Sequence, residues 1–381
     1  MIYLDYAATA PIRPQVARLV AERLNDPLGN PSSLHRAGRR ARILLERARE
    51  ACAKLLGAEV EEIVFCSGAT EADNLAILGT LTHGDCEQQS LVSCITEHAA
   101  VYETVRRQEM LGREVSWLPV NSDGLLNLES LGKRLSEGPP ALVSVMVVNN
   151  EVGTRQPVEE IGKLCREHGA LFHADGVQDP ETAQTLIQSG LVDLVALSGH
   201  KMGGLHGGLL FVKQGIPLNP QIVGGAQEDG RRAGTSEVLR AESLALAQEL
   251  SLAESRESCR AHQEIFQQAL RNLEGAIELG PKEPEKSAAH ISSWLFQDLP
   301  AEPVLVQLDM KGICASSGSA CSSHSVEPSR VVKAMGYSDL QASGLIRFSF
   351  GWNTTAEEVE EAAGIVREVA SRMMSKERRK R

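Results

Sequence analysis

Alternation of short apolar runs with helical stretches is the feature that most constrains how this chain can fold. Between Glu62 and Val212 the strand-like runs lie at 63–65, 91–93, 115–117, 142–148, 171–173, 194–197 and 209–212. The segments between them, such as 157–167, repeat apolar residues at helical spacing. This order predicts strand–helix–strand crossovers and a mostly parallel sheet. We therefore expect an α/β fold.

The pattern changes in the last third of the chain. Residues 237–274 contain no Gly or Pro, which predicts a long helical stretch with a bend or a domain junction inside it. Strand-like runs at 289–296 and 345–350 and a helix from Thr355 to about Met373 then indicate a smaller α+β domain. We expect a large α/β domain over 13–255 and a small domain formed by 1–12 plus 256–381. The charged tail, 376–381, is expected to be solvated and frayed.

Charge and cysteine usage exclude several classes of protein. Thirty-nine Lys plus Arg against fifty Asp plus Glu give a net charge of -11, which argues against a nucleic-acid binder. The N-terminus lacks the pattern of a signal peptide, and no run approaches the roughly 20 apolar residues that cross a bilayer. Eight cysteines without paired spacing indicate a reducing cytoplasm and no metal site.

Polar clusters follow several predicted strands, at the edge where parallel sheets place ligands. The segment 67–71 is equally well a phosphate cradle or a helix cap, and His98 alone is more typical of capping or packing than of catalysis. Asp175 alone is best explained by a structural salt bridge, and Lys201 by a surface position. Cys321 lies among small residues, which suits an exposed loop better than a core.

Together these residues carry more weight than any one of them. A lysine amine, a carboxylate at the end of a strand and glycine-rich loops with hydroxyl groups are the parts that pyridoxal 5'-phosphate requires. The amine holds the cofactor covalently, the carboxylate keeps the ring nitrogen protonated, and helix-start donors hold the phosphate. The combination predicts a pyridoxal-phosphate enzyme.

Ten short motifs make the chain resemble the cysteine desulfurases, a pyridoxal-phosphate-dependent family of the class V aminotransferase superfamily. They lie in the family's order at 4–9, 30–38, 67–71, 97–98, 149–153, 173–178, 198–201, 234–235, 318–321 and 347–351. The resemblance implies a fold-type I pyridoxal-phosphate transferase. It also implies that the large domain holds the cofactor and that the small domain carries the catalytic cysteine.

The resemblance implies a role for each matched residue around the cofactor. Lys201 would bind it covalently and act as acid and base, and Asp175 would pair with its ring nitrogen. His98 would stack on the ring and assist proton transfer, while Gln178 and Asn150 would bond to the ring oxygen. The phosphate would be held by Ala69, Thr70, Ser198 and His200, joined by Thr235 from a partner subunit.

For the substrate, the resemblance implies that Arg347 holds the carboxylate of L-cysteine with help from Asn30. Cys321 would be the nucleophile that takes the sulfur. The 26 positions from Cys321 to Arg347 are similar to the desulfurase group with the longer cysteine loop. Departures from the family pattern fall in loops, at Gly176, 179–181, 202–208 and Ala226.

The expected activity is conversion of L-cysteine to L-alanine by a cytoplasmic homodimer. The persulfide formed on Cys321 would pass to an acceptor protein, either an iron–sulfur scaffold or a tRNA-thiolation protein. Two alternatives stay open at this point. One is a selenocysteine lyase or another class V enzyme with the same lysine and aspartate, and the other is a catalytically silent scaffold of a sulfur pathway.

Overall fold

The computed structural model describes residues 1–82, 90–318 and 328–379. Its centre is a seven-stranded sheet in the order β2-β8-β7-β6-β5-β3-β4. The strands are β2 (Ile63–Cys66), β3 (Leu91–Cys94), β4 (Val115–Leu118), β5 (Leu142–Ser144), β6 (Leu171–Asp175), β7 (Leu194–Ser198) and β8 (Gly208–Val212). Only β8 breaks the parallel arrangement, because it is antiparallel to both β2 and β7. The predicted mostly parallel α/β sheet is confirmed.

The run at 142–148 forms a shorter strand than its apolar residues suggested. β5 ends at Ser144, yet the amides of Val145 and Val147 still donate to carbonyls of β6, at 3.1 and 2.9 Å. The whole run is buried, so it reads as one apolar segment in the sequence although only its first half pairs as regular strand. Its second half leads the chain to the edge of the sheet where Asp175 ends β6.

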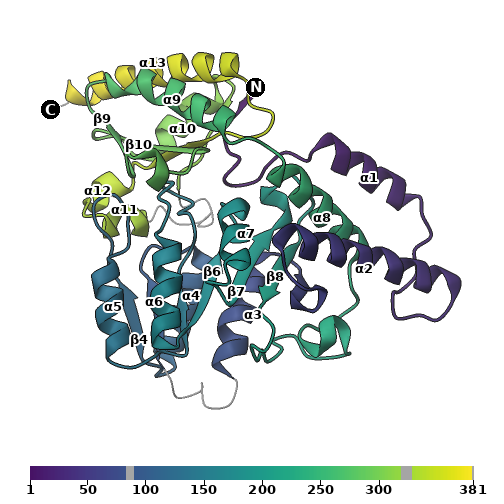
Figure 1. The fold of residues 1–381 in the computed structure, drawn as a ribbon. Helices are drawn as coiled ribbons and strands as arrows, with labels where there is room; N and C mark the ends of the chain where they lie inside the picture. Colours follow the sequence, from purple (N-terminus) through teal and green to yellow (C-terminus); the bar gives the residue numbers. More distant parts are fainter. Residues whose placement is uncertain (83–89, 319–327, 380–381) are drawn as a thin grey trace.

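Helices cover both faces of this sheet (Figure 1). One face packs against α2 (Arg36–Leu56), α5 (Leu128–Ser136), α6 (Val158–His168), α7 (Pro180–Gln188) and α8 (Val238–Leu252). The other face packs against α3 (Ala69–Leu81) and α4 (Ala99–Met110). Successive strand residues alternate between the two cores, which is why the strands read as continuous apolar runs. The helix α1 (Pro14–Leu24) packs beside α8.

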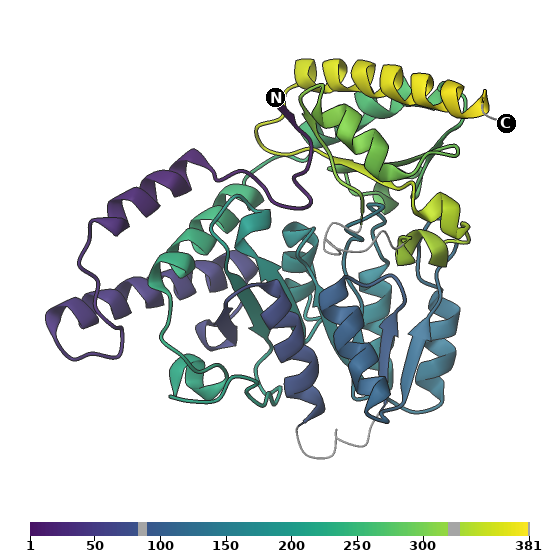
Figure 2. The same ribbon diagram turned by 180° about the vertical axis from the view of Figure 1, so that it is seen from behind.

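The seven-stranded sheet and its helices form the large body. A second body, the small body, is built on the three-stranded antiparallel sheet β12-β10-β9. Its strands are β9 (Ala276–Glu278), β10 (Ile291–Phe296) and β12 (Ile346–Ser349), and its helices are α9 (Glu257–Arg271), α10 (Ala301–Asp309), α11 (Arg330–Ala334), α12 (Asp339–Ala342) and α13 (Ala356–Arg378). A short parallel pair, β1 (Ile2–Tyr3) with β11 (Ile313–Cys314), brings the N-terminus into this body. Figures 1 and 2 show it stacked on one end of the large sheet.

The long helical stretch predicted over 237–274 is broken where a bend or junction was expected. It forms α8 and α9, separated by residues 253–256. The tail differs from expectation, because α13 continues to Arg378 instead of fraying before it. Lys376 and Arg378 occupy the last turn of that helix, where positive charge interacts favourably with the helix dipole.

We propose the domain division expected from the sequence, 13–255 against 1–12 plus 256–381. Its support is the main apolar core of the second body, which contains Leu4, Phe266, Trp294 and Phe348 and includes none of the described residues between 13 and 255. A smaller cluster joins Val152 to residues of this body. The core on one face of the large sheet is drawn almost entirely from that middle range, apart from Ala7, Ala288 and Ile291.

Candidate active site

A cavity of about 390 Å³ opens at the ends of the parallel strands. The ends of β6 and β7 and the segments that follow β2, β3, β5, β6 and β7 form most of its wall. The N-terminal segment and β12 of the small body contribute the rest of the residues discussed below. The predicted site residues on this wall are Ala69, Thr70, His98, Asn150, Asp175, Gln178, Ser198, His200, Lys201 and Arg347. Residues separated by almost 280 positions in the sequence therefore meet around one space.

Lys201 reaches the cavity from a short 3₁₀ turn (Gly199–Lys201) directly after β7. Its Nζ donates to the carbonyl oxygens of Ala7 and Ala8, at 2.6 and 2.7 Å. The N-terminal segment thus supplies acceptors for the amine. The segment 202–208 departs from the family pattern, but its start still forms a closed turn after Lys201. The amides of Met202 and Gly204 both donate to the Gly199 carbonyl.

Asp175 ends β6 with its side chain buried beside the cavity. Its Oδ1 accepts a hydrogen bond from the Val177 amide at 3.0 Å. Burial, followed by the charge of the nearby Asp73 carboxyl, raises the pKa of Asp175 to about 6. A buried carboxylate of this kind is stabilised by a cation brought to it, such as a protonated ring nitrogen.

Asp73 was not singled out from the sequence, although it also lines the cavity. Its Oδ1 lies 3.5 Å from Nε2 of His173, whose Nδ1 is 2.9 Å from the Ser144 hydroxyl. Burial raises the pKa of Asp73 to about 8 and lowers that of His173 to about 4. Burial therefore disfavours the charged form of both groups. The buried residues of α3 include Thr80 as well as Asp73, so nothing local in the sequence separates Asp73 from an ordinary helix residue.

His98 occupies the turn between β3 and α4 and caps the helix with its side chain. Its Nδ1 accepts from the Ala100 amide at 3.1 Å, so the imidazole carries its proton on Nε2 when neutral. Burial lowers the pKa of His98; Asp175 raises it, while Lys201 and Arg330 lower it. The capping role considered from the sequence is present, and the same ring lines the cavity.

The other end of the cavity combines a helix start with hydroxyl and imidazole groups. Ala69 and Thr70 open α3, and the Ser198 hydroxyl lies 2.8 Å from Nδ1 of His200. Burial, followed by the charge of Lys201 and by His206, lowers the pKa of His200 to about 4. A neutral imidazole, a hydroxyl and the free amides of a helix N-terminus suit a phosphate group.

Arg347 enters from β12, and only 2% of its side chain is exposed. Its two Nη atoms donate to the Asn150 carbonyl at 2.7 Å and to Oδ1 of Asp5 at 2.9 Å. Its buried Nε has no hydrogen-bond partner among the described residues. The Gln178 amide nitrogen donates to the Ala7 carbonyl at 2.9 Å, and its oxygen lies 3.3 Å from Nε2 of His290.

Two predicted residues lie away from this cavity wall within the chain. Asn30 is exposed, and its side chain accepts from the Ser32 amide at 2.9 Å in a turn before α2. Thr235 is exposed in the loop before α8. Cys321 lies outside the residues that the structure describes.

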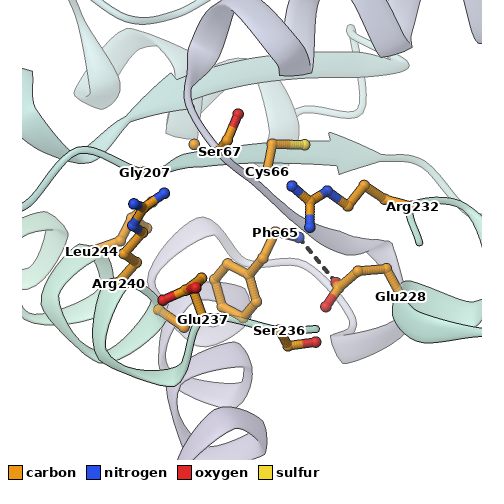
Figure 3. Close-up of a pocket in the computed structure, with 12 residues that line it drawn as sticks. Phe65, Cys66, Ser67, Gly207, Glu228, Arg232, Ser236, Glu237, Arg240 and Leu244 are labelled. Carbon is orange, nitrogen blue, oxygen red and sulfur yellow. Dashed lines mark hydrogen bonds between the residues drawn. The ribbon is translucent and has the colours of Figure 1, made fainter. Parts of the chain in front are cut away.

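The loop that carries Thr235 borders a second, smaller hollow of about 40 Å³ (Figure 3). Glu228 anchors this loop, since its carboxylate pairs with Arg49 at 2.6 Å and accepts from the Phe65 amide at 3.0 Å. The hollow shares Ser67 and Gly207 with the large cavity. The loop is thus fixed next to the large cavity, while Thr235 itself is exposed and lines neither space.

The cavity residues fit pyridoxal phosphate. Asp175 offers a buried carboxylate for the ring nitrogen, Lys201 offers an amine, and the α3 start with Ser198 and His200 offers phosphate donors. Arg347 lies on the same wall, and its guanidinium suits the carboxylate of an amino acid.

Other classes of site find no support in the part of the chain that the structure describes. No group of three or more His, Cys, Asp or Glu side chains there is arranged to hold a metal ion. Within the same residues, no helix has both the length and the apolar character needed to cross a membrane.

Comparison with known proteins agrees with this geometry. The aminotransferase class-V family model matches residues 2–361. The chain is 39% identical over 377 residues to "Putative cysteine desulfurase IscS 1" of Bacillus subtilis (98% of this chain, 99% of the relative) and 35% identical to "Cysteine desulfurase IscS" of Dictyoglomus turgidum (98% and 95%).

Solved structures give the same result. A "NIFS-LIKE PROTEIN" superposes with a TM-score of 0.87 at 31% identity, covering 97% of this chain and 99% of the other. "SspA in complex with cysteine" superposes with a TM-score of 0.77 at 29% identity, covering 92% and 99%. The fold, the pyridoxal-phosphate site and these relatives lead to one assignment: the chain belongs to the cysteine desulfurases of the class V aminotransferase family.

Proposed function

We propose that the protein is a homodimeric cysteine desulfurase that converts L-cysteine to L-alanine and keeps the sulfur as a persulfide on Cys321. The observation that carries this proposal is the meeting of Lys201, Asp175 and Arg347 on one cavity wall. An amine, a buried carboxylate and a carboxylate-binding guanidinium are the three groups that an amino-acid-processing site of this family needs. The selenocysteine lyase alternative shares them and differs in the leaving group.

Pyridoxal phosphate, when bound, supplies an electron sink that stabilises negative charge at the α-carbon of the substrate. Asp175 would pair with the ring nitrogen, and the α3 start with Ser198 and His200 would hold the phosphate. Lys201, whose Nζ the Ala7 and Ala8 carbonyls hold, would carry the proton taken from the α-carbon. His98, whose Nδ1 accepts from the Ala100 amide, would lie against the ring.

Arg347 would orient the substrate by binding its carboxylate from the cavity wall. The Cys321 thiolate then attacks the substrate sulfur. An S–S bond forms, the Cβ–S bond breaks with its electron pair left on carbon, and a proton delivered to that carbon completes the methyl group of alanine. L-cysteine plus the Cys321 thiol thus balance alanine plus the Cys321 persulfide.

A homodimer completes the proposed site. Thr235 would reach the phosphate of the neighbouring subunit and Asn30 its substrate, which agrees with their exposed positions away from the wall of their own cavity. We place the enzyme in the cytoplasm and its persulfide on the way to a protein acceptor, either an iron–sulfur scaffold or a tRNA-thiolation protein.

The deciding experiment replaces Cys321 with Ser, which keeps the shape and removes the sulfur nucleophile. We expect the variant to bind L-cysteine with a shift of the cofactor absorbance, because that step needs Lys201, Asp175 and Arg347. Alanine formation with a reductant should fall by orders of magnitude, and the one-sulfur mass increment on the wild-type peptide should be missing. Alanine formation near the wild-type rate would instead identify a direct lyase.

A further inference from the structure

Arg330 lies in the small body, and its side chain ends in the large one. It is the first residue of α11. Its Nη1 donates to the Ile95 carbonyl, and its Nη2 donates to the Glu97 carbonyl at 2.6 Å. Its guanidinium carbon is 3.6 Å from the centre of the Tyr102 ring, which places it over the ring face. One side chain therefore holds three points on the large body.

These three contacts surround His98. The two carbonyls lie three residues and one residue before it, and Tyr102 lies one helical turn after it. The turn that joins β3 to α4 is short. The Glu97 amide donates to the Cys94 carbonyl at 3.3 Å, and the next residue, His98, already caps the helix. Arg330 thus fixes the backbone whose only side chain on the cavity wall is that of His98.

The carbonyls are satisfied by a geometry that only a guanidinium provides. Two separate N–H groups of one planar fork reach two acceptors on the same turn, while the flat face of the fork stacks on Tyr102. The site is largely removed from water, and burial lowers the pKa of Arg330 below its usual range. Without the fork, two main-chain acceptors in this turn would lose their partners.

The positive charge of Arg330 also affects the pKa of His98. Burial lowers the pKa of His98, Asp175 on β6 raises it, and Lys201 after β7 and Arg330 on α11 lower it. The cap on the Ala100 amide requires an unprotonated Nδ1. A positive charge behind the turn therefore favours the imidazole form that caps α4 and faces the cofactor site.

We propose that Arg330 is a positioning residue for His98: its fork fixes the turn from the small-body side and so sets the orientation of the imidazole against the cofactor. The proposal rests on the proposed role of His98 beside the cofactor ring. It connects the body that contains Arg347 to the ring-facing side of the site. A merely structural clamp between the two bodies is the rival explanation.

The test compares Arg330→Gln, which removes the charge and the fork, with Arg330→Lys, which keeps only the charge. Lys333→Gln is the matched control, because Lys333 lies on the same helix and pairs with the exposed Asp339 at 2.8 Å. The pKa of His98 is read in full-length apoprotein by NMR of labelled histidines, with the signal assigned from His98→Asn. The dissociation constant of pyridoxal phosphate is measured by equilibrium dialysis.

For Arg330→Gln we expect the proton affinity of His98 to rise about threefold to tenfold and cofactor binding to weaken about tenfold. Arg330→Lys should leave the proton affinity within twofold of wild type and still weaken cofactor binding, because one ammonium cannot serve both carbonyls. The control should change neither.

Either readout staying within twofold of wild type in a folded Arg330→Gln would overturn the proposal, and a lowered melting temperature alone would then identify a clamp. If that variant does not fold, unchanged cofactor binding by Arg330→Lys overturns it equally. Neither measurement uses L-cysteine. A wild-type protein that makes no alanine would therefore count against the proposed function alone.

Discussion

Replacement of Asp179 by Asn should destabilise the protein more than any exposed ion-pair change. Asp179 caps α7, and its side chain is fully buried between two arginines. Its carboxylate bonds to Nη1 of Arg155 at 2.5 Å and to Nη2 of Arg256, and it accepts from the Thr182 amide at 3.0 Å. Arg256 lies in the break between α8 and α9, so this one carboxylate ties the large body to the junction.

The size of the effect follows from the charges. Burial alone would raise the pKa of Asp179, but the hydrogen bond to Arg256 and the charges of Arg256 and Arg155 lower it to about 2. Against an unfolded value near 3.9 this corresponds to roughly 2–3 kcal/mol in favour of the folded state. Asn also leaves Arg155 without its anion and leaves Arg256 with only the exposed Glu181, so we expect a loss of about 3 kcal/mol.

The pH dependence has a definite sign. A carboxyl whose folded pKa is depressed stabilises the protein above its unfolded pKa, and that stabilisation disappears as the pH falls from about 4 toward 2. Asp179→Asn should therefore be destabilised at pH 7 and approach the wild type only in acid.

The assay is equilibrium urea denaturation at pH 7, followed by tryptophan fluorescence and circular dichroism on the apoprotein. Glu181→Gln is the matched control, because Glu181 pairs with the same Arg256 at 2.6 Å but is 58% exposed, and it should cost less than about 1 kcal/mol. An Asp179→Asn protein that loses no more than this control would refute the argument that the buried pair network stabilises the junction.

Three further outcomes can be checked. Arg347→Lys keeps the charge but loses the two-pronged guanidinium, so KM for L-cysteine should rise at least tenfold with a smaller change in kcat. Steady-state alanine assays measure both, and an unchanged KM would contradict the prediction. Gly208→Ala would place a Cβ 2.4 Å from the Gly68 backbone carbonyl carbon, so we expect weakened cofactor binding and a lower melting temperature, against Gly364→Ala, where nothing lies within 4 Å. Mixed dimers of Lys201→Ala and Thr235→Ala chains should regain about one working site, whereas complete inactivity would argue against shared sites.

The apolar strand pattern predicted most of the large sheet, because strands that are buried on both faces are apolar at nearly every position. The small body was harder to predict. β9 has only half-buried residues and β1 pairs two residues with a segment more than 300 positions away, so neither leaves a local pattern. The helical extension to Arg378 was missed because a charged tail reads as solvated whether or not it is helical.

The site shows the same division between local and distant information. Lys201, Asp175 and the start of α3 follow strands directly, so their motifs could be placed at one edge of the sheet from the sequence. Asp73 looks like an ordinary helix residue until its neighbour His173 is known to lie 3.5 Å away on another element. Arg330 gives no signal at all, because its acceptors are main-chain carbonyls, which every residue has.

The contact of Lys201 with the carbonyls of Ala7 and Ala8 bears on the order in which the protein can be completed during synthesis. The first residues are held by segments made near the end of translation, since Ile2 pairs with Ile313 and the Ser349 amide donates to the Leu4 carbonyl at 2.8 Å. The central sheet is complete in sequence at Val212. At about 5–20 residues per second, these later contacts therefore follow the finished sheet by on the order of ten seconds. During that interval the earliest-made residues of the active site depend on contacts with the large body, such as Gln178 on the Ala7 carbonyl and the Ala10 amide on the His200 carbonyl.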